Sequence, residues 1–147
     1  MRVHISLPAT NLEKSQAFYS ELFAASPSKV KEDYLNFRLD EPAIHLSLIE
    51  SNAAHNNPQQ HFGIELPSED LFDSWRERLV DNDSTASSKT QAKTESEAKV
   101  LIEDGAKCCY AQGNKLWLAD PDGHRWEIWH RTGEFDALTQ PEEKCCA

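Results

Sequence analysis

Residues 1–23 read MRVHISLPATNLEKSQAFYSELF, and residues 58–80 read PQQHFGIELPSEDLFDSWRERLV. The two segments align without gaps at an offset of 57, so that His4 falls on His61 and Leu7 on Ile64. Each copy begins with alternating polar and apolar residues and continues with apolar residues three or four apart. Alternation is typical of a half-buried strand, and the longer spacing is typical of an amphipathic helix. The repeat therefore predicts two copies of one module that begins with a strand and a helix.

Capping residues indicate where each helix begins. Thr10 and Glu13 stand at capping-box spacing, so we expect the first helix to start near Thr10. Ser68 is expected to cap the second helix, because Glu69 and Asp70 follow it and suit the positive end of a helix dipole.

The second half of each module also matches. Alternating residues at 35–39 and 44–48 flank a turn at 40–42, and alternating residues at 116–118 and 125–131 flank Asp120-Pro121-Asp122-Gly123. Both pairs predict antiparallel hairpins, and Asp-Gly is a strong turn signal. Each module is thus strand, helix, then two or three strands, which predicts an α+β protein with helices outside the sheet.

We expect one domain over residues 1–131 and a flexible tail over 132–147 that ends in cysteines. Within the domain, module one covers 1–50, a linker covers 51–59, and module two covers 60–131. Residues 81–98 contain no large apolar side chain and are rich in Ser, Thr, Lys, Asp and Glu, which is typical of a mobile insertion.

The overall composition is that of a globular protein. Of 147 residues, 39% are hydrophobic and 27% are charged, and the formal charge of −10 argues against nucleic-acid and anionic-lipid partners. We expect no membrane span, because no apolar run approaches roughly 20 residues. We also expect no signal peptide, because residues 1–7 lack a long apolar stretch and a small-residue cleavage site. The cysteines form two adjacent pairs, Cys108-Cys109 and Cys145-Cys146, and neighbouring residues are too close for an ordinary disulfide. This predicts a cytoplasmic protein with reduced thiols.

Three predicted strands carry metal-binding side chains on their polar faces. His4 and His61 occupy equivalent places in the repeat, and Glu127 stands on the polar side of the last strand. Two imidazoles and one carboxylate would form a facial triad that leaves positions open for water, substrate or dioxygen. Fe(II) is the usual ion in such a site, although Zn, Mn, Co or Ni could also bind there.

The other four histidines are weaker candidates for metal ligands. We interpret His45 as holding, in the first hairpin, the position that Glu127 holds in the second, so that His45 is either a fourth ligand or a residue lining the pocket. His55 and His130 are interpreted as structural or exposed residues, and His124, which follows the turn glycine, as a surface residue.

Cys108 and Cys109 are candidate binding residues for a soft, thiophilic centre. Two adjacent thiolates suit trivalent arsenic or cadmium, and Lys107 would favour the thiolate form. Neighbouring side chains on a strand point to opposite faces, so a joint role requires an irregular segment, for which Gly105 is suited. The alternative is that both are small, inert core residues.

The doubled module with His4, His61 and Glu127 resembles the vicinal oxygen chelate superfamily of glyoxalases, bleomycin-resistance proteins and dioxygenases. The segments Val3-His4-Ile5-Ser6-Leu7, Cys108-Cys109-Tyr110-Ala111 and Arg125-Trp126-Glu127 are similar to its arsenic- and cadmium-inducible branch. The resemblance implies two βαβββ modules that form an incomplete barrel of mixed β-sheet.

That branch contains carbon–arsenic lyases, which are non-haem Fe(II) dioxygenases. The resemblance implies that Cys108 and Cys109 hold a trivalent organoarsenical while Fe(II) on His4, His61 and Glu127 binds dioxygen, and that arsenite is released. Two alternatives stay open: a binding protein that sequesters arsenic or cadmium without turnover, and a glyoxalase-like or antibiotic-resistance metalloenzyme. The chain is expected to be a monomer or a homodimer.

Overall fold

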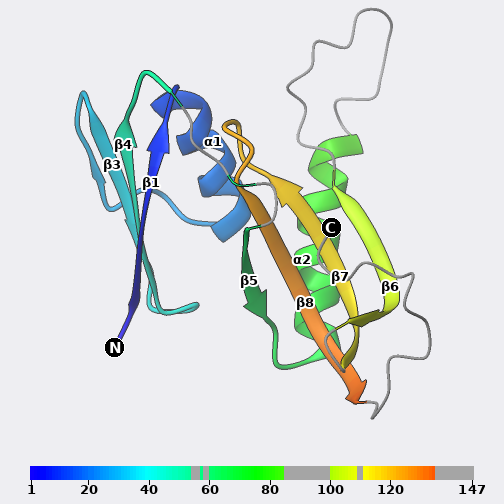
Figure 1. Cartoon of the computed structure of the whole chain (residues 1–147). Helices are drawn as coiled ribbons and strands as arrows, with labels where there is room; N and C mark the ends of the chain where they lie inside the picture. The colour runs from blue at the N-terminus through cyan, green and yellow to red at the C-terminus, as the bar shows by residue number, and fades with distance from the viewer. Residues whose placement is uncertain (54–56, 58–59, 85–99, 109–110, 135–147) are drawn as a thin grey trace, which may run out of the picture. The chain divides into compact units, whose positions relative to one another are not determined.

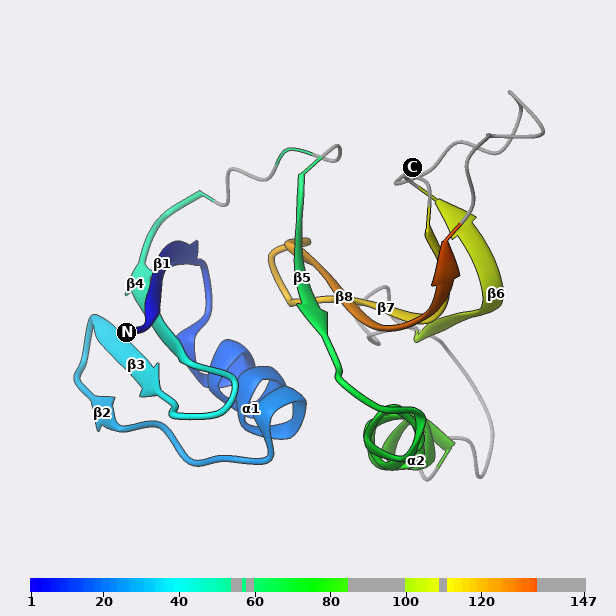
Figure 2. The same cartoon turned by 90° about the horizontal axis from the view of Figure 1, so that it is seen from below.

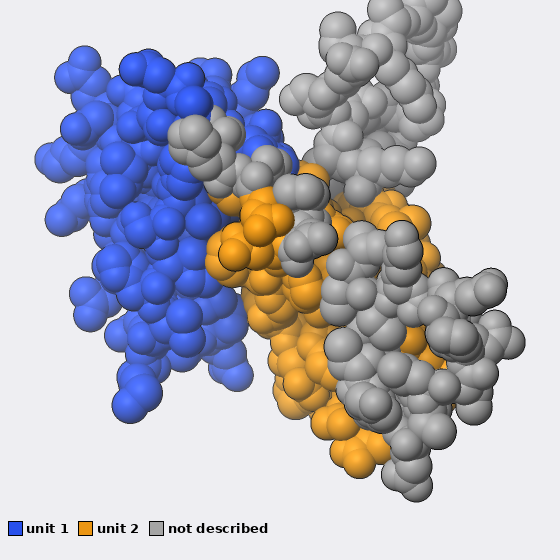
Figure 3. Space-filling model, in the orientation of Figure 1, with its two compact units in different colours: residues 1–56, 120–123 blue, residues 57–119, 124–147 orange. Residues whose placement is uncertain are grey.

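The computed structural model describes residues 1–53, 57, 60–84, 100–108 and 111–134. The chain divides into two compact units, Met1–Asn56 with Asp120–Gly123, and Asn57–Ala119 with His124–Ala147 (Figure 3). We call them unit 1 and unit 2. Neither helix in the described residues has the length and apolar character needed to cross a membrane.

Unit 1 contains one βαβββ module (Figure 1). Its elements are β1 (Val3–Ala9), α1 (Leu12–Phe23), β2 (Lys29–Val30), β3 (Tyr34–Arg38) and β4 (Ile44–Glu50). The strands form an open sheet in the order β1-β4-β3-β2, in which β1 and β4 are parallel and the other pairs are antiparallel. Helix α1 packs against β3 and β4, where Tyr19 and Leu22 are fully buried with Phe37 and Leu46.

Helix α1 begins one residue later than the capping pattern predicted. Asn11 is the N-cap, and its side-chain oxygen accepts a hydrogen bond of 2.9 Å from the backbone N–H of Lys14. The prediction of Thr10 as the cap was wrong because Thr10 has another partner: its hydroxyl and its backbone N–H both donate to the carboxylate of Asp122. Ala24 ends the helix in the left-handed conformation with φ of 49°.

The turn 120–123 is counted with unit 1 although it joins two strands of unit 2. Its Asp120 is buried and accepts a hydrogen bond of 2.7 Å from the hydroxyl of Tyr19. The backbone N–H of Gly123 donates to the carbonyl of Asp120 at 2.9 Å, which confirms the turn expected from Asp-Gly. The turn is thus hydrogen-bonded to Tyr19 of α1 and to Thr10, which lies two residues before that helix.

Unit 2 repeats the module. Its elements are β5 (His61–Glu65), α2 (Glu69–Ser84), β6 (Leu101–Cys108), β7 (Ala111–Ala119) and β8 (Arg125–Glu134), and the sheet order is β5-β8-β7-β6 (Figure 2). The parallel pair is again the first strand with the last. The hydroxyl of Ser68 accepts a hydrogen bond from the N–H of Leu71, which confirms Ser68 as the cap of α2.

The two sheets have the same strand order in their modules, so the predicted α+β class with two βαβββ modules is confirmed. Strand β8 continues to Glu134, and α2 continues to Ser84, beyond the bounds that hydropathy indicated for the domain end and the insertion. Residues 85–98 of the predicted insertion, 135–147 of the predicted tail and parts of the predicted linker lie outside the described residues.

Candidate metal centre

The polar face of the unit 2 sheet gathers the strongest ligand candidates. Gly63 on β5 is the register partner of Glu127 on β8, and Glu127 is also the partner of Trp117 on β7. Paired residues share a face of the sheet, as do residues two apart on one strand. His61 and Lys115 therefore lie on the same face as Glu127. This face has a carboxylate that is only 7% exposed at its centre.

His61 and Glu127 fit a shared metal ion. The His61 Nε2 atom lies 3.5 Å from Glu127 Oε2. Nitrogen and oxygen ligands that each bind an ion at about 2.0–2.2 Å stand about 3 Å or slightly more apart. The two atoms thus have the separation and the chemistry of neighbouring ligands, with one borderline and one hard donor.

Gly63 leaves room for this carboxylate. A Cβ atom at position 63 would lie 3.3 Å from Glu127 Oε2. Since Gly63 has no positive φ, its role here is close approach and not an unusual backbone conformation. A glycine in a strand interior weakens the strand, so its presence suits a place where another group comes close to the backbone.

The other oxygen of Glu127 faces a buried cation. Lys115 Nζ lies 2.6 Å from Glu127 Oε1, and the two side chains are 8% and 9% exposed. The contact is an ion pair and not a well-formed hydrogen bond, because Oε1 has no hydrogen-bond partner in the described structure. The carboxylate therefore has one oxygen on the lysine side and one on the histidine side.

The indole ring of Trp117 lies on the same face of the sheet, in contact with the ring of His61. The His61 ring meets the Trp117 ring edge-on, with centroids 5.1 Å apart and an angle of 77° between the planes. The Arg125 guanidinium lies 4.6 Å from the Trp117 ring centroid. The indole N–H donates a hydrogen bond of 3.1 Å to Glu103 Oε2, which restricts the ring in its plane. Trp117 thus limits the positions that His61 can adopt.

Unit 1 carries a related polar face around His4. His4 on β1 pairs in register with His45 on β4, and the two rings stack with centroids 4.4 Å apart and 14° between the planes. His4 Nε2 lies 3.3 Å from Ser47 Oγ. The Ser47 hydroxyl also contacts Tyr34 OH at 3.0 Å, and the Asn36 amide donates to that tyrosine oxygen at 3.0 Å. These contacts leave His4 exposed at the end of a polar network.

The comparisons with known proteins agree with this doubled architecture. The family model of the "Glyoxalase/Bleomycin resistance protein/Dioxygenase superfamily" matches residues 2–128. The chain belongs to this superfamily, which is also called the vicinal oxygen chelate superfamily. Among its relatives is a "Trivalent organoarsenical cleaving enzyme" of Bacillus sp. (strain MD1), 34% identical over 97% of this chain and 81% of the relative.

Two further matches extend the comparison. The "Cadmium-induced protein CadI" of Mycobacterium bovis is 33% identical over 87% of this chain and 74% of the relative. The crystal structure of the fosfomycin resistance protein FosX from Listeria monocytogenes, complexed with Mn(II) and sulfate, has a TM-score of 0.61 and 18% identity. That match covers 90% of each chain and shows the fold alone.

The register corrects one equivalence between the two superfamily modules. His4 pairs with His45, whereas His61, its repeat equivalent, pairs with Arg125. His45 therefore corresponds to Arg125, and the prediction that it holds the place of Glu127 was wrong by two residues. Ser47 corresponds to Glu127, because Ser6 pairs with Ser47 as Gly63 pairs with Glu127. The contact between His4 and Ser47 is the counterpart of that between His61 and Glu127.

His45 is held in a positive environment. Its ring Nε2 lies 3.2 Å from the Asn36 amide nitrogen. Burial, followed by the nearby charges of His4, Arg38 and Arg2, lowers the pKa of His45 below its usual value of 6.5. The lowered pKa favours the neutral imidazole at physiological pH.

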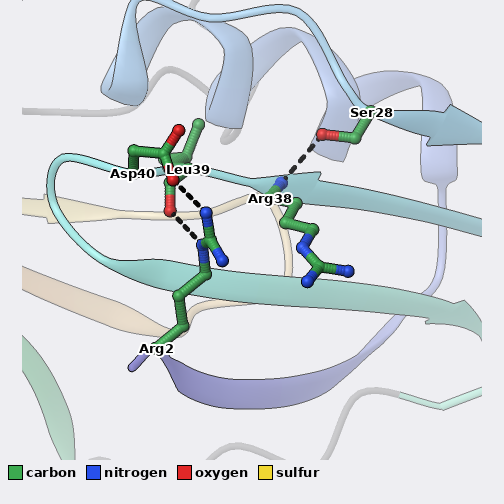
Figure 4. A network of polar contacts seen from close by, with 5 residues as sticks. All are labelled: Arg2, Ser28, Arg38, Leu39 and Asp40. Atoms are coloured by element: carbon green, nitrogen blue, oxygen red, sulfur yellow. Dashed lines mark hydrogen bonds and ion pairs between the residues drawn. The ribbon is translucent and has the colours of Figure 1, made fainter.

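The Arg2 side chain and the Arg38 backbone each make polar contacts in unit 1. Arg2 pairs with Asp40 and donates a hydrogen bond of 2.8 Å to the carbonyl of Leu39, while the backbone N–H of Arg38 donates to Ser28 Oγ at 2.9 Å (Figure 4).

The structure brings together two of the three predicted triad residues. His61 and Glu127 meet in unit 2, while His4 belongs to unit 1. Among the described residues, no group of three or more His, Cys, Asp or Glu side chains is placed to hold a metal ion. The backbone of Cys108 ends β6 opposite Ala111; Cys109 and the side chain of Cys108 lie outside the described residues, as do Cys145 and Cys146.

An irregularity lies upstream of the cysteines, while the segment at Cys109, where a joint role of the two thiols requires one, lies outside the described residues. The pairing of β6 with β7 shifts register between Glu103 and Ala106, and Gly105 adopts a φ of 67° there. Only glycine takes this conformation readily, so the bulge lies where the sequence places its glycine.

The remaining histidines, His55, His124 and His130, were predicted to be structural or exposed residues. His130 Nδ1 lies 3.0 Å from the carbonyl oxygen of Leu66, which confirms it as a structural residue, and His55 lies outside the described residues. The prediction that His124 is a surface residue was wrong, because its exposure is only 7%. Its place directly after the turn carries it back toward the sheet as β8 begins.

Sequence reasoning missed Lys115, which lies against the candidate ligand Glu127. The signal was present: Lys115 directly precedes the apolar run Leu116-Trp117-Leu118 and lies on the same side of the strand as Trp117. A lysine among buried residues of a strand generally has an anionic partner, and Glu127 was the carboxylate on the facing strand.

Proposed function

We propose that this protein cleaves the carbon–arsenic bond of trivalent organoarsenicals and releases arsenite, with Fe(II) as its metal and dioxygen as co-substrate. One observation carries the proposal: a buried carboxylate and an imidazole stand at ligand separation in a chain 34% identical, over 97% of its length, to a trivalent organoarsenical cleaving enzyme. The name of this relative suggests the substrate class, and His61 and Glu127 are two side chains that could bind the metal.

His61, Glu127 and His4 are the proposed ligands. An imidazole pair with one carboxylate suits Fe(II), and the same set also accepts Zn, Mn, Co or Ni. Fe(II), when bound, would supply the electrons that allow dioxygen to react. The chain contributes the two neighbouring donors at 3.5 Å in unit 2, and the glycine at position 63 keeps the space beside Glu127 Oε2 clear of a side chain. His45, whose Nε2 lies 3.2 Å from the Asn36 amide nitrogen, is proposed either to line the site or to act as a fourth ligand.

Cys108 and Cys109 are the proposed arsenic-binding residues. Trivalent arsenic binds thiolates strongly, and a vicinal pair can hold it at two points. Binding would place the carbon–arsenic bond at a constant distance from the metal, and such positioning supplies much of a rate enhancement. Because both thiols must be reduced, the proposal places the protein in the reducing cytoplasm, as a monomer or a homodimer.

The reaction balances without a further reductant. Methylarsonous acid, CH₃As(OH)₂, and O₂ together contain the atoms of arsenous acid, As(OH)₃, and formaldehyde, CH₂O. Carbon is oxidised and dioxygen is reduced, while arsenic stays trivalent. Arsenite and formaldehyde are therefore the products to be measured.

The test is anaerobic reconstitution with Fe(II), addition of methylarsonous acid, and then admission of oxygen. We expect equal amounts of arsenite and formaldehyde. Binding of the arsenical that protects the thiols without arsenite release would indicate a sequestering protein and overturn the proposal. Glyoxalase activity in a protein that leaves the arsenical unreacted would indicate a glyoxalase-like metalloenzyme and would also overturn the proposal.

Variants assign the roles. His61→Ala is expected to abolish arsenite release and weaken metal binding, because it removes one of two adjacent donors. Cys108→Ser is expected to weaken arsenical binding and leave metal binding intact. The matched control is His130→Gln, since His130 contacts the carbonyl of Leu66 and not the candidate ligands. Metal binding unchanged in both His4→Ala and His61→Ala would contradict the proposed ligand set.

A further inference from the structure

Lys115 and Glu127 form a buried ion pair that the ligand set does not explain. The ammonium lies 2.6 Å from Glu127 Oε1, and less than a tenth of either side chain is exposed. Burying two charges is costly unless they pair closely. The lysine thus compensates one oxygen of the carboxylate, and this is the oxygen that has no hydrogen-bond partner among the described residues.

The sheet holds the ammonium in this place. Lys115 is the register partner of Trp129, and Trp117 is the register partner of Glu127. Lys115 Nζ lies 5.7 Å from the Trp117 ring centroid and 5.8 Å from the Trp129 ring centroid. A cation attracted to aromatic rings within about 6 Å has little freedom to leave them. The lysine side chain is thus confined between two indoles and the carboxylate.

The two oxygens of Glu127 therefore have different environments. Oε1 faces a protonated amine, which has no lone pair and cannot bind a metal. Oε2 faces His61 Nε2 at 3.5 Å and lies 3.3 Å from the position that a Cβ atom of residue 63 would occupy. Only Oε2 is directed to the side where the second donor lies.

We propose that Lys115 is a positioning residue that holds Glu127 as a one-oxygen ligand, with Oε1 retained by the ammonium and Oε2 presented beside His61. The inference rests on the proposed metal centre. A carboxylate that binds through both oxygens occupies one more coordination position than a carboxylate that binds through one. Lys115 thereby keeps a position available for a reactant.

The test uses the full-length protein loaded with Co(II), whose visible absorption weakens as its coordination number rises. Lys115→Met removes the ammonium and retains an unbranched apolar stem between the indoles. We expect a several-fold weaker Co(II) band in Lys115→Met and its recovery in Lys115→Arg, which restores a cation. Lys31→Met, at an exposed lysine of unit 1, is the control and should match the wild type.

Kinetics provide the second measurement. With Fe(II), Lys115→Met should lower kcat about 10–100-fold, the range typical for partners of metal ligands, and leave KM for the organoarsenical within a few-fold. If Lys115→Met does not fold, Lys115→Leu, which also has no hydrogen-bond donor, replaces it with the same expectation. A Co(II) spectrum of the folded variant identical to that of the wild type would overturn the inference. Wild-type protein that binds Co(II) but releases no arsenite would overturn only the proposed function.

Discussion

The substitution Gly63→Ala should weaken metal binding and leave the free energy of unfolding nearly unchanged. The new methyl group would stand 3.3 Å from Glu127 Oε2, which is closer than most carbon–oxygen contacts of a Cβ atom. Glu127 cannot easily withdraw, because its other oxygen is paired with Lys115 at 2.6 Å. The methyl group therefore crowds the oxygen that we propose binds the metal.

The expected magnitudes follow from two opposing terms. At a backbone conformation that alanine can adopt, Gly→Ala gains about 0.4–1 kcal/mol because the unfolded chain has fewer conformations. A side chain pushed off its preferred torsion costs about 0.5–1.5 kcal/mol, so the free energy of unfolding should stay within about 1 kcal/mol of wild type. The metal dissociation constant, in contrast, should rise about tenfold or more, because a donor displaced from its place weakens binding.

The assay is urea denaturation together with calorimetric titration of Mn(II). Gly133→Ala is the matched control, since a Cβ atom at Gly133 has no atom within 4 Å. Its unfolding free energy should equal or slightly exceed that of the wild type, and its Mn(II) affinity should be unchanged. Equal Mn(II) affinity in Gly63→Ala, Gly133→Ala and wild type would refute the placement of the metal beside Glu127 Oε2.

Three other predictions concern the caps and charges. Asn11→Ala should lower the free energy of unfolding by about 1 kcal/mol through loss of the N-cap, measured by urea denaturation. Glu127→Ala should cost about 3–5 kcal/mol because it leaves Lys115 buried without its carboxylate, whereas Glu127→Ala with Lys115→Met should cost clearly less in thermal and urea melts. Because burial and nearby positive charge lower the pKa of His45, the unfolded chain takes up the proton first as the pH falls below about 6.5, and folded stability declines on acidification. His45→Gln should reduce this decline between about pH 7.5 and pH 5.5.

Much of the fold could be predicted because its pattern lies within single segments. Alternation and helical spacing recur at an offset of 57, and each copy does form a strand followed by a helix. The hairpin turn at 120–123 and the Ser68 cap depend on local chemistry, and both are as expected. The choice between Thr10 and Asn11 was different, since a partner more than a hundred residues away, Asp122, decides it.

The candidate site could be predicted only in part, for a related reason. A period of two places His45 on the polar side of its strand but says nothing about which residue of the next strand lies opposite it. Register depends on the pairing of whole strands, and here it sets His45 beside His4 and Ser47 in the place of Glu127. The partnership of Lys115 with Glu127 likewise requires the pairing of β7 with β8.

The strand register shows that the two modules differ in the oxygen-bearing side chain that lies beside the imidazole of the first strand. Both modules keep an imidazole at the same point of their first strand, and both place an oxygen-bearing side chain beside it, at 3.3 Å in unit 1 and 3.5 Å in unit 2. In unit 1 that oxygen is the hydroxyl of Ser47, which also contacts the hydroxyl of Tyr34 at 3.0 Å. In unit 2 it is a carboxylate with its own buried cation. Among the described residues beside these two imidazoles, the second module therefore has a carboxylate with a lysine that compensates its charge, where the first module has a hydroxyl.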